Sequence, residues 1–310
     1  MLQQTQVTTV IGYFERFMLR FPTVKDLASA EIDEVLHLWS GLGYYARGRN
    51  LHHAAQIICA DHGGELPICL EDLVALPGIG RSTGSAILAI AHGQRHAILD
   101  GNVKRVLTRL QCVAGVPDAS ATLKQLWPLA EALTPSERVG NYTQAIMDLG
   151  ATVCTRTKPR CDECPVATLC EAKRTQTQAN FPNKKIKKKI PIKQASFLRI
   201  LNSDGHVLLQ KRPPTGIWGG LWCLPELETD KDLMQWCKTL GLQAMGKPIE
   251  LATLTHTFTH FRLEMLPLEL SVEANCSIVM DSDSWLWYNI ANPASVGIAK
   301  PMTTLLQGKK

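Results

Sequence analysis

The sequence predicts two regions of different fold class, a mainly helical N-terminal half and a mixed α and β C-terminal domain. Up to about residue 172, short helical segments are separated by Gly or Pro, as in "GLGYYARGRN", "LPGIG" and "VPDAS", and little alternates as a strand would. From about residue 195, "SFLRIL" and "HVLLQKR" flank "NSDG" in the pattern of a β-hairpin, and "THTFTHFRLEMLPLEL" is a further extended region. We therefore expect domains at 1–172 and 195–310, joined by a linker at 173–194.

Composition narrows the class of protein. The chain has 310 residues, 45% hydrophobic and 20% charged, enough for two domains with their own cores. It contains no apolar run long enough to span a bilayer, and its polar start does not resemble a signal peptide, so we expect a cytoplasmic protein without a membrane partner. A net charge of +5 only weakly favours a polyanionic partner.

The first segment, "MLQQTQV", leads into a helix. Apolar residues recur at intervals of three and four, at Val7, Val10, Ile11, Phe14 and Phe17. This spacing predicts that one face of the helix packs against a core. No capping residue or acidic first turn precedes the segment.

The stretch "LPGIGRSTGSAIL" predicts a turn between two helices. Gly78 and Gly80 bracket this turn, so backbone N–H groups and a helix N-terminus can approach an anion closely. That is the form of a helix-hairpin-helix phosphate clamp, and an ordinary helix connection is the alternative. Further along, Asp100 in "LDGNVKRVL" has two compatible roles. It can cap the helix that begins near Val103, and its carboxylate is placed for work on a sugar.

Four of the ten cysteines fall in one short stretch, "CTRTKPRCDECPVATLC". Their pattern, C-x6-C-x2-C-x5-C, can enclose a tetrahedral zinc or a [4Fe–4S] cluster, and the single C-x2-C pair favours the cluster. These residues are Cys154, Cys161, Cys164 and Cys170. We expect the scattered cysteines to be core thiols rather than disulfides: Cys59, Cys69, Cys112, Cys223, Cys237 and Cys276.

Positive charge gathers at two places. Arg156, Lys158 and Arg160 surround the cysteine loop and would suit nearby DNA phosphates. The stretch "NKKIKKKIPIK" is both a typical solvated linker and a possible strap along a phosphate backbone, and these interpretations are compatible.

Six ordered stretches together resemble one family. "MLQQTQV", "LWSGLGYYARGRNL", "LPGIGRSTGSAIL", "LDGNVKRVL", "MDLGA" and the cysteine loop are similar to the MutY adenine DNA glycosylases of the endonuclease III superfamily. The resemblance covers nearly the whole chain. It implies a helix-hairpin-helix glycosylase domain at 1–172 that holds a [4Fe–4S] cluster, and a MutT-like, Nudix-like domain at 195–310.

The implied function is base excision repair, by hydrolysis of the bond between the sugar and an adenine mispaired with 8-oxoguanine or guanine. The implied partner is double-stranded DNA carrying such a mispair, and we expect a monomer. Because the target base lies inside a duplex, the enzyme must flip it out and fill the gap.

The resemblance also assigns roles to single residues. Gln4 and Tyr44 match positions that wedge into the helix around the oxidised guanine, where an amide can bond to base edges and a ring can stack. Asp100 matches an ionised aspartate that stabilises the sugar cation. Ser82 lies where lyase members carry a Schiff-base lysine, so we expect no strong strand-cleaving activity. Further DNA contacts are expected at Thr5, Leu42, Gly78, Gly80 and Asn102. Arg81 and Lys104 are expected to contact phosphate.

The general acid of the resembled family is a glutamate just upstream of the "MLQQTQ" stretch. In this chain the first acidic residue is Glu15, too far along to be assumed equivalent. We therefore expect that the general acid belongs to a segment before Met1. A mis-assigned start, a fragment and a catalytically impaired mismatch-binding chain all fit this expectation.

The C-terminal half resembles a MutT-like domain, but it lacks the hydrolase motif of that domain. A nucleotide pyrophosphohydrolase needs G-x5-E-x7-R-E-x2-E-E to hold magnesium, and "TDKDLMQWCKTLG" has no such run. Recognition is the better role. Phe258, Thr259 and His260 match the family's 8-oxoguanine contacts, although the family commonly has serine at the position of Thr259. His256 and His260 can alternatively be strand residues bonded to backbone.

Overall fold

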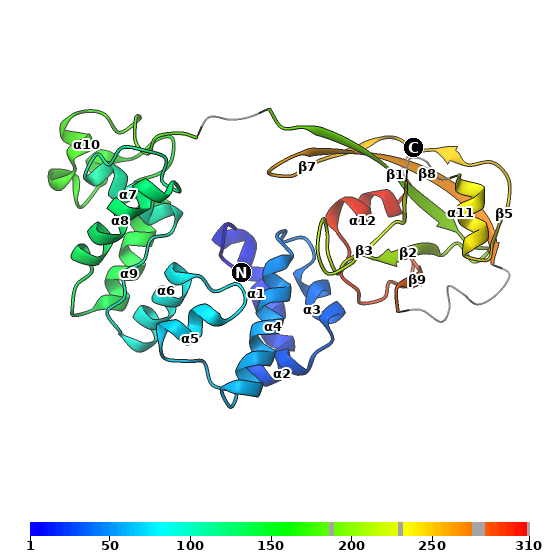
Figure 1. Ribbon diagram of the computed structural model, residues 1–310, viewed down its shortest axis with the longest axis horizontal. Helices are drawn as coiled ribbons and strands as arrows, with labels where there is room; N and C mark the ends of the chain where they lie inside the picture. Colours follow the sequence, from blue (N-terminus) through cyan, green and yellow to red (C-terminus); the bar gives the residue numbers. More distant parts are fainter. Residues whose placement is uncertain (186–188, 229–231, 275–282, 309–310) are drawn as a thin grey trace. The chain divides into compact units, whose positions relative to one another are not determined.

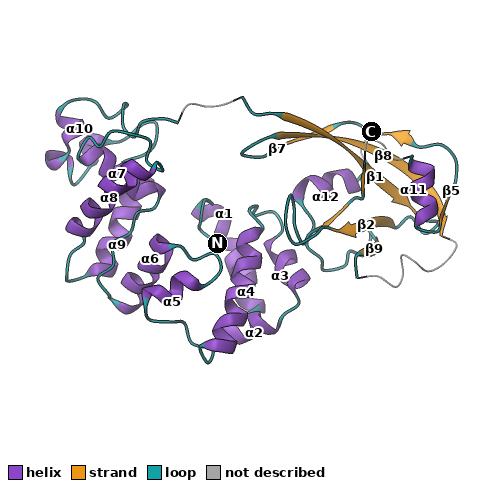
Figure 2. Cartoon of the chain, in the orientation of Figure 1, coloured by secondary structure: helices purple, strands orange, loops and turns teal. Residues whose placement is uncertain are grey.

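The chain folds into two compact units that do not follow the sequence linearly. A computed structural model describes residues 1–185, 189–228, 232–274 and 283–308 (Figures 1 and 2). One unit combines residues 1–59 with 189–310, and the other comprises residues 60–188. The domain limits expected from the sequence, 1–172, 173–194 and 195–310, differ from these units and remain a proposal. Cys276 and part of the lysine-rich stretch, at 186–188, lie outside the described residues.

The first unit opens with four helices: α1 Val7–Arg20, α2 Val24–Ser29, α3 Ile32–Trp39 and α4 Ala46–Asp61. Local signals set their ends. Thr23 and Asp26 form a capping box at the start of α2, which satisfies two backbone N–H groups that the helix leaves unpaired. Arg20 of α1 forms an ion pair with Glu34 of α3.

The apolar face expected on α1 is only partly buried. Val10 and Phe17 are each 5% exposed and pack into a core with Trp39, whereas Val7, Ile11 and Phe14 are more than half exposed. The expectation of one buried stripe containing all five residues was therefore wrong. Two apolar stripes run side by side on this helix, and the spacing alone does not say which of them faces the core.

The same unit contains a mixed sheet. Its strands are β1 Ile192–Leu201, β2 Val207–Lys211, β3 Trp222–Cys223, β4 Glu226–Leu227, β5 Leu242–Ala244, β6 Ile249–Glu250, β7 Leu254–Thr257, β8 Arg262–Ala274 and β9 Trp285–Tyr288. The main path is β3-β2-β1-β8-β5, with β1 and β8 parallel and the other pairs antiparallel. The expected hairpin is confirmed, since β1 and β2 pair around residues 202–206. The second extended region is itself a hairpin of β7 and β8.

Helices pack against both faces of the sheet. Phe197 and Met265 point into a core shared with α12 Lys300–Leu306. Leu198 and Leu270, of the opposite parity, point into a second core that includes Cys237 of α11 Leu233–Thr239. The alternation along β1 and β8 explains the two cores, because successive side chains of a strand leave on opposite faces.

Helix α3 is joined to this sheet. Leu36 is fully buried in the core that contains Phe197. Asp33 accepts hydrogen bonds from the Lys211 ammonium at 3.0 Å and from the indole of Trp222 at 3.3 Å. The N-terminal helices and the sheet of this unit therefore share a continuous core with a polar edge.

The second unit is helical. It comprises α5 Leu70–Ala75, α6 Arg81–His92, α7 Gly101–Leu110, α8 Ser120–Leu133, α9 Val139–Asp148 and α10 Glu171–Arg174. A π-helical turn, Leu149–Val153, extends α9, and two short 3-10 turns, Cys161–Glu163 and Ala167–Leu169, lie in the cysteine loop. Val103, Val106 and Leu107 place the apolar face of α7 at the centre of the core, against Leu126 of α8 and Ile146 of α9.

The scattered cysteines are only partly core thiols. Cys223 and Cys237 are buried, whereas Cys59, Cys69 and Cys112 are half-buried. Cys69 instead caps α5, because its sulfur accepts from the backbone N–H of Asp72 at 3.4 Å. Cysteine is not among the usual capping residues, so the sequence around Cys69 does not indicate this role. In the part of the chain that the structure describes, no helix is long and apolar enough to cross a membrane.

Candidate functional site

Asp100 lies at the N-terminus of α7, in the helical unit. Its Oδ1 accepts the backbone N–H of Val103 at 2.7 Å, so the expected capping role is confirmed and the helix begins at Gly101. One residue earlier, the backbone N–H of Leu99 donates to Ser82 Oγ at 3.0 Å, which ties α6 to the turn before Asp100. Capping engages one carboxylate oxygen. The second oxygen stays available for another task.

The glycine turn has the geometry expected of an anion-binding connection. Gly78 has a φ of +81°, a conformation that side chains disfavour, and Gly80 is the N-cap of α6 without a capping side chain. A Cβ at Gly80 would meet no atom within 4 Å, so the space beside the helix N-terminus is open. A helix N-terminus of this kind favours negative charge.

The two cations assigned to phosphate are paired within the unit. Arg81 bonds to Glu131 at 2.6 Å and lies 3.7 Å from the centroid of the Trp127 ring. Lys104 bonds to Asp118 at 2.6 Å. Both carboxylates are at least half exposed, and pairs open to solvent are weak, so a phosphate could replace either carboxylate. The phosphate contacts remain predictions.

Arg105 connects the start of α7 to the cysteine loop. Its guanidinium donates to Asn102 Oδ1 at 2.7 Å, to the carbonyl of Gly150 at 2.7 Å and to the carbonyl of Cys154 at 2.7 Å. The packing is close, because a Cβ at Gly150 would lie 2.6 Å from the Cβ of Asn102. Burial lowers the pKa of Arg105. The first turn of α7, which follows Asp100, is thereby fixed to the first cysteine of the loop.

All four cysteines of the loop line one cavity, together with Arg109 and Lys173. Each thiol is half-buried. Burial is the main cause that raises the pKa of Cys170, and the neighbouring thiols of Cys154 and Cys161 add to it. Such thiols lose their protons when a cation binds, because the thiolate is the ligand form.

The spacing of these thiols suits a cluster better than a single ion. Within the described ranges, no three His, Cys, Asp or Glu side chains are close enough together to hold one metal ion. A [4Fe–4S] cube is bonded to its four cysteines at four separate iron atoms, so its sulfur ligands lie further apart than those of one zinc. Four cysteines around one cavity, but not converged on one point, fit the larger group.

Arg109 is the buried cation that braces this loop. It is 3% exposed. Its guanidinium donates to Cys154 Sγ at 3.3 Å and to the carbonyl of Thr155 at 2.7 Å. It also donates to the carbonyls of Gln178 at 3.2 Å and Phe181 at 2.9 Å, which lie beyond the last cysteine. One side chain therefore binds both ends of the loop and lies beside the sulfur of the first cysteine.

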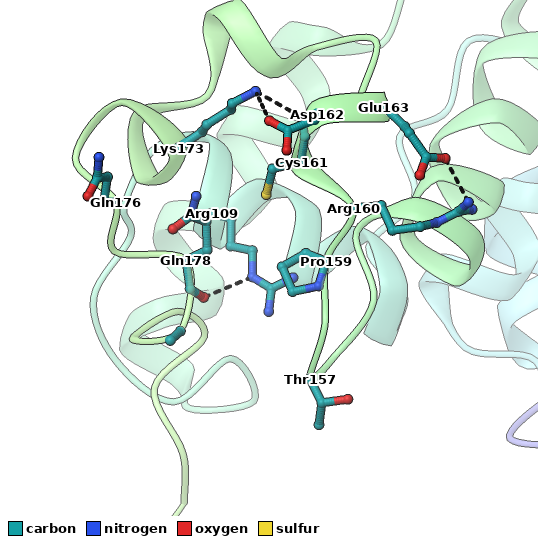
Figure 3. A pocket seen from close by; sticks show the side chains of 11 residues that line it. Arg109, Thr157, Pro159, Arg160, Cys161, Asp162, Glu163, Lys173, Gln176 and Gln178 are labelled. Carbon is teal, nitrogen blue, oxygen red and sulfur yellow. Dashed lines mark hydrogen bonds and ion pairs between the residues drawn. The ribbon is translucent and has the colours of Figure 1, made fainter.

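An open cavity of about 680 Å³ adjoins this arrangement (Figure 3). Figure 3 shows Arg109, Pro159 and Cys161 on its wall, with Lys173 above Cys161. Lys173 donates to the carbonyl of Cys161 at 3.0 Å and to Asp162 at 3.1 Å. These contacts hold the 3-10 turn that presents Cys161.

Residues assigned to lesion recognition lie in the other unit. Gln4 is exposed and Tyr44 is 52% exposed, so neither is a packing residue, whereas Tyr45 is partly buried against the core. Gln4 has a φ of +58° and Tyr44 a φ of +49°. A left-handed conformation is uncommon for residues other than glycine and often marks functional positions.

Two neighbouring assignments have different surroundings. The Thr5 hydroxyl accepts from Arg47 Nη2 at 3.0 Å. Leu42 is 7% exposed and belongs to the core with Trp39, so its side chain supports the turn that carries Tyr44. A direct DNA contact from Leu42 would need a rearrangement, and it stays a prediction.

The hairpin tip between β7 and β8 carries the other recognition residues. Thr259 and His260 are exposed, and Phe258 is half-buried and stacks on buried Phe261 with ring centroids 4.6 Å apart. His256 packs edge-on against Phe258 at 4.6 Å, and burial lowers its pKa. Thr259 Oγ1 and His260 Nδ1 lie 3.4 Å apart. No backbone partner is recorded for either histidine ring among the described residues.

Sequence reasoning missed three arginines: Arg47, Arg105 and Arg109. In a helix, a single arginine usually indicates a solvated face. Each donates to carbonyls or side chains that lie 42 to 72 residues away along the chain, and Arg47 and Arg105 also donate to acceptors within four residues. No local pattern could indicate such contacts.

Comparisons with known protein families divide the chain in the same order as the motifs. The model of the HhH-GPD superfamily of base excision DNA repair proteins matches residues 1–132. The iron–sulfur binding domain of endonuclease III matches residues 154–170, the segment from the first to the last of the four cysteines. The NUDIX domain matches residues 197–308.

Curated relatives match along the full length of this chain. The adenine DNA glycosylase of Buchnera aphidicola subsp. Acyrthosiphon pisum is 35% identical over 310 residues, which cover 100% of this chain and 88% of that protein. The human adenine DNA glycosylase is 34% identical over 367 residues, covering 100% of this chain and 67% of that protein.

Solved structures support the helical fold. A thermostable thymine-DNA glycosylase matches with a TM-score of 0.51 and 27% identity, over 56% of this chain and 80% of that one. An endonuclease III trapped as a covalent intermediate with DNA matches with a TM-score of 0.50 and 23% identity, over 56% and 81% of the two chains.

The motifs, the fold and the full-length relatives agree. The helix-hairpin-helix and Nudix-like fold classes expected from the sequence are confirmed, and the cofactor is a [4Fe–4S] cluster. The protein is a DNA glycosylase of base excision repair that acts on DNA. With 34–35% identity to adenine DNA glycosylases across its whole length, the chain belongs to the adenine DNA glycosylase family.

Proposed function

We propose that this glycosylase removes adenine mispaired with 8-oxoguanine or guanine. The single observation that carries the proposal is the pair of left-handed residues, Gln4 and Tyr44, in the same unit as the exposed hairpin tip at 258–260. An exposed ring and amide can enter a duplex, and an exposed histidine and threonine can bond to a base edge.

Asp100 is proposed as the carboxylate that supports the chemistry. Hydrolysis breaks the bond between the sugar carbon and the adenine nitrogen, leaves the bonding electrons with adenine, and forms a new bond from the sugar carbon to a water oxygen. Positive charge develops on the sugar before water adds. A fixed carboxylate at a helix N-terminus lies in a defined place, and its charge stabilises that cation.

The absence of a lysine at position 82 supports a monofunctional reaction. Ser82 instead accepts a hydrogen bond from Leu99 N–H at 3.0 Å, which steadies the turn that leads to Asp100. A serine hydroxyl forms no Schiff base with the sugar. The product is therefore an abasic site in an intact strand.

The four loop cysteines are proposed as the ligands of the cluster. Cys154, Cys161, Cys164 and Cys170 line one cavity, and the matched iron–sulfur domain begins and ends at two of them. The cluster supplies a rigid link between four points of the loop. The Arg109 guanidinium donates to Cys154 Sγ and would neutralise charge at this sulfur when the cluster is bound, and Arg156, Lys158 and Arg160 give the loop a positive charge that suits DNA phosphates.

The remaining proposals concern the whole chain. The glycine turn at 78–80 and Asn102 are proposed DNA contacts, and the protein is proposed to be a cytoplasmic monomer with domains at 1–172 and 195–310 and a linker between them. A native mass measurement of the protein bound to one duplex would test the monomer directly.

Single-turnover excision tests the proposed function. Duplexes with adenine opposite 8-oxoguanine, guanine or thymine are treated with excess protein, and abasic sites are revealed by alkali. We expect the rate order 8-oxoguanine, guanine, thymine, with no strand break before alkali. Equal rates for all three would overturn the substrate proposal, and binding without excision would favour the mismatch-binding alternative.

A further inference from the structure

Arg47 of α4 forms hydrogen bonds with two segments, one that carries Gln4 and one that carries Tyr44. Its Nη1 donates to the carbonyl of Met1 at 2.7 Å and also to the carbonyl of Gln3. Its Nη2 donates to Thr5 Oγ1 at 3.0 Å and to the carbonyl of Gly43 at 3.3 Å. The acceptors flank Gln4 on both sides and precede Tyr44.

The aromatic surroundings fix the guanidinium in place. Its central carbon lies 5.5 Å from the ring centroid of Trp39 and 5.5 Å from that of Tyr44, within the range of cation–π attraction. The Trp39 indole donates to the carbonyl of Gly43 at 3.3 Å, so the same turn is held from two directions. Among the described residues, the Nε of Arg47 is buried and has no hydrogen-bond partner.

The backbone at the wedge residues needs such support. Gln4 and Tyr44 both have positive φ, a conformation that an isolated segment rarely adopts. Hydrogen bonds to the carbonyl before Gln4, to the Thr5 hydroxyl after it, and to the carbonyl before Tyr44 hold the chain in these conformations. A guanidinium suits this task, because it is planar and presents several donors at fixed angles.

We propose that Arg47 is a positioning residue that holds Gln4 and Tyr44 ready to enter DNA before the lesion is met. It fixes both segments at once, so the energy of binding is not spent on ordering them. The inference rests on the proposed function, since it assigns to Arg47 the preparation of the residues that recognise the mispair. Arg47 acts through Gln4 and Tyr44 and need not touch the DNA itself.

The variants separate positioning from folding. Arg47→Lys keeps the charge but loses the fork of donors that reaches both segments. Arg49→Lys is the matched control, because Arg49 lies two residues away on α4 and donates instead to the carbonyl of Gly219. Tyr44→Ala removes the ring that Arg47 is proposed to place. Thermal unfolding of every variant reports any general loss of structure.

The experiment is a double-mutant cycle on binding. Fluorescence anisotropy measures the Kd for a duplex with 8-oxoguanine opposite a non-cleavable adenine analogue, and for a matched duplex. We expect Arg47→Lys to weaken binding to the mispaired duplex about tenfold and to change matched binding less than about twofold. In the Tyr44→Ala background the same change should have a much smaller effect, since both act through one element.

A second reading follows the wedge itself. A 2-aminopurine beside the 8-oxoguanine changes its fluorescence when a ring enters the stack, and Arg47→Lys should reduce this change while Arg49→Lys leaves it intact. Additive effects of Arg47→Lys and Tyr44→Ala, or an unchanged 2-aminopurine response, would overturn the inference. A lack of preference for the mispaired duplex in the unmodified chain would instead overturn the proposed function, and the inference with it.

Discussion

The two compact units of this glycosylase differ in how their functional residues are held. In the unit of residues 60–188, Asp100 accepts the backbone N–H of Val103, and two buried or half-buried arginines donate short hydrogen bonds to Asn102 and to the cysteine loop. In the other unit, the residues proposed for lesion recognition are exposed and lie on turns: Gln4, Tyr44, Thr259 and His260. A group that stabilises a transition state must be fixed in place, whereas groups that enter DNA must be accessible.

This difference predicts separable effects. Changes in the helical unit should affect the cluster or the rate of base removal, and changes at the exposed turns should affect the choice of mispair.

Removal of one cysteine should cost the whole cluster. In Cys164→Ser one of the four proposed ligands is lost, and we expect the purified protein to lose its brown colour and most of its iron. Cys69→Ser, at a helix cap outside the loop, is the matched control and should keep both. Stoichiometric zinc in the anaerobically purified unmodified protein would contradict the iron–sulfur assignment.

Arg109→Met should loosen the same loop without removing a ligand. The change leaves several carbonyls and a cysteine sulfur without their donor, and we expect a loss of unfolding free energy of roughly 3 kcal/mol. Iron release to a chelator, followed by visible absorbance, should become faster. Arg160→Met removes a half-exposed cation from the same loop and should have a small effect. Equal release rates for the two variants would show that Arg109 does not brace the cluster.

His260→Ala should reduce the preference for 8-oxoguanine over guanine. His260 is exposed at the hairpin tip, so its loss should leave the fold intact and remove a hydrogen-bonding group, with an expected effect of about tenfold on the ratio of excision rates. Thr255→Ala, exposed on β7 of the same hairpin, serves as the control. If the ratio stays unchanged, the tip does not read the oxidised base.

The smallest effect concerns pH. Burial lowers the pKa of His256 below its ordinary value of 6.5, so the unfolded chain binds its proton more readily than the folded chain. The contribution of His256 to stability is therefore fully present above pH 6.5 and is lost as pH falls from there through the lowered folded pKa. Thermal midpoints from about pH 7.5 to 5.5 should fall more for the unmodified protein than for His256→Phe. Parallel curves would contradict this.

Much of the architecture could be predicted from the sequence, because its signals are local. The four cysteines, the capping Asp100, the glycine turn and the β1 to β2 hairpin each depend on residues a few positions apart. The MutT-like half was predicted without hydrolase function because "TDKDLMQWCKTLG" lacks the paired glutamates. Helix α11 lies within this stretch and has no acidic residue from Leu233 to Thr239.

The remainder depends on distant partners. Which stripe of α1 is buried is decided by Trp39 and Leu27, which belong to other helices. The roles of Arg47 and Arg109 depend on carbonyls in distant segments, and a helical arginine has no local mark of such a role. The grouping of residues 1–59 with 189–310 follows from the buried contact of Leu36 with the sheet core, which no linear pattern indicates.

One measurement tests the separation of chemistry from recognition most directly. Asn is as good an N-cap as Asp, so Asp100→Asn keeps the bond to Val103 N–H and removes only the charge. For protein that excises adenine before the change, we predict that single-turnover excision falls by about 10²-fold or more, while the Kd for the 8-oxoguanine:adenine duplex changes less than about threefold. An equal loss of binding and rate, or an unchanged rate, would contradict the account and leave Asp100 as a helix cap alone.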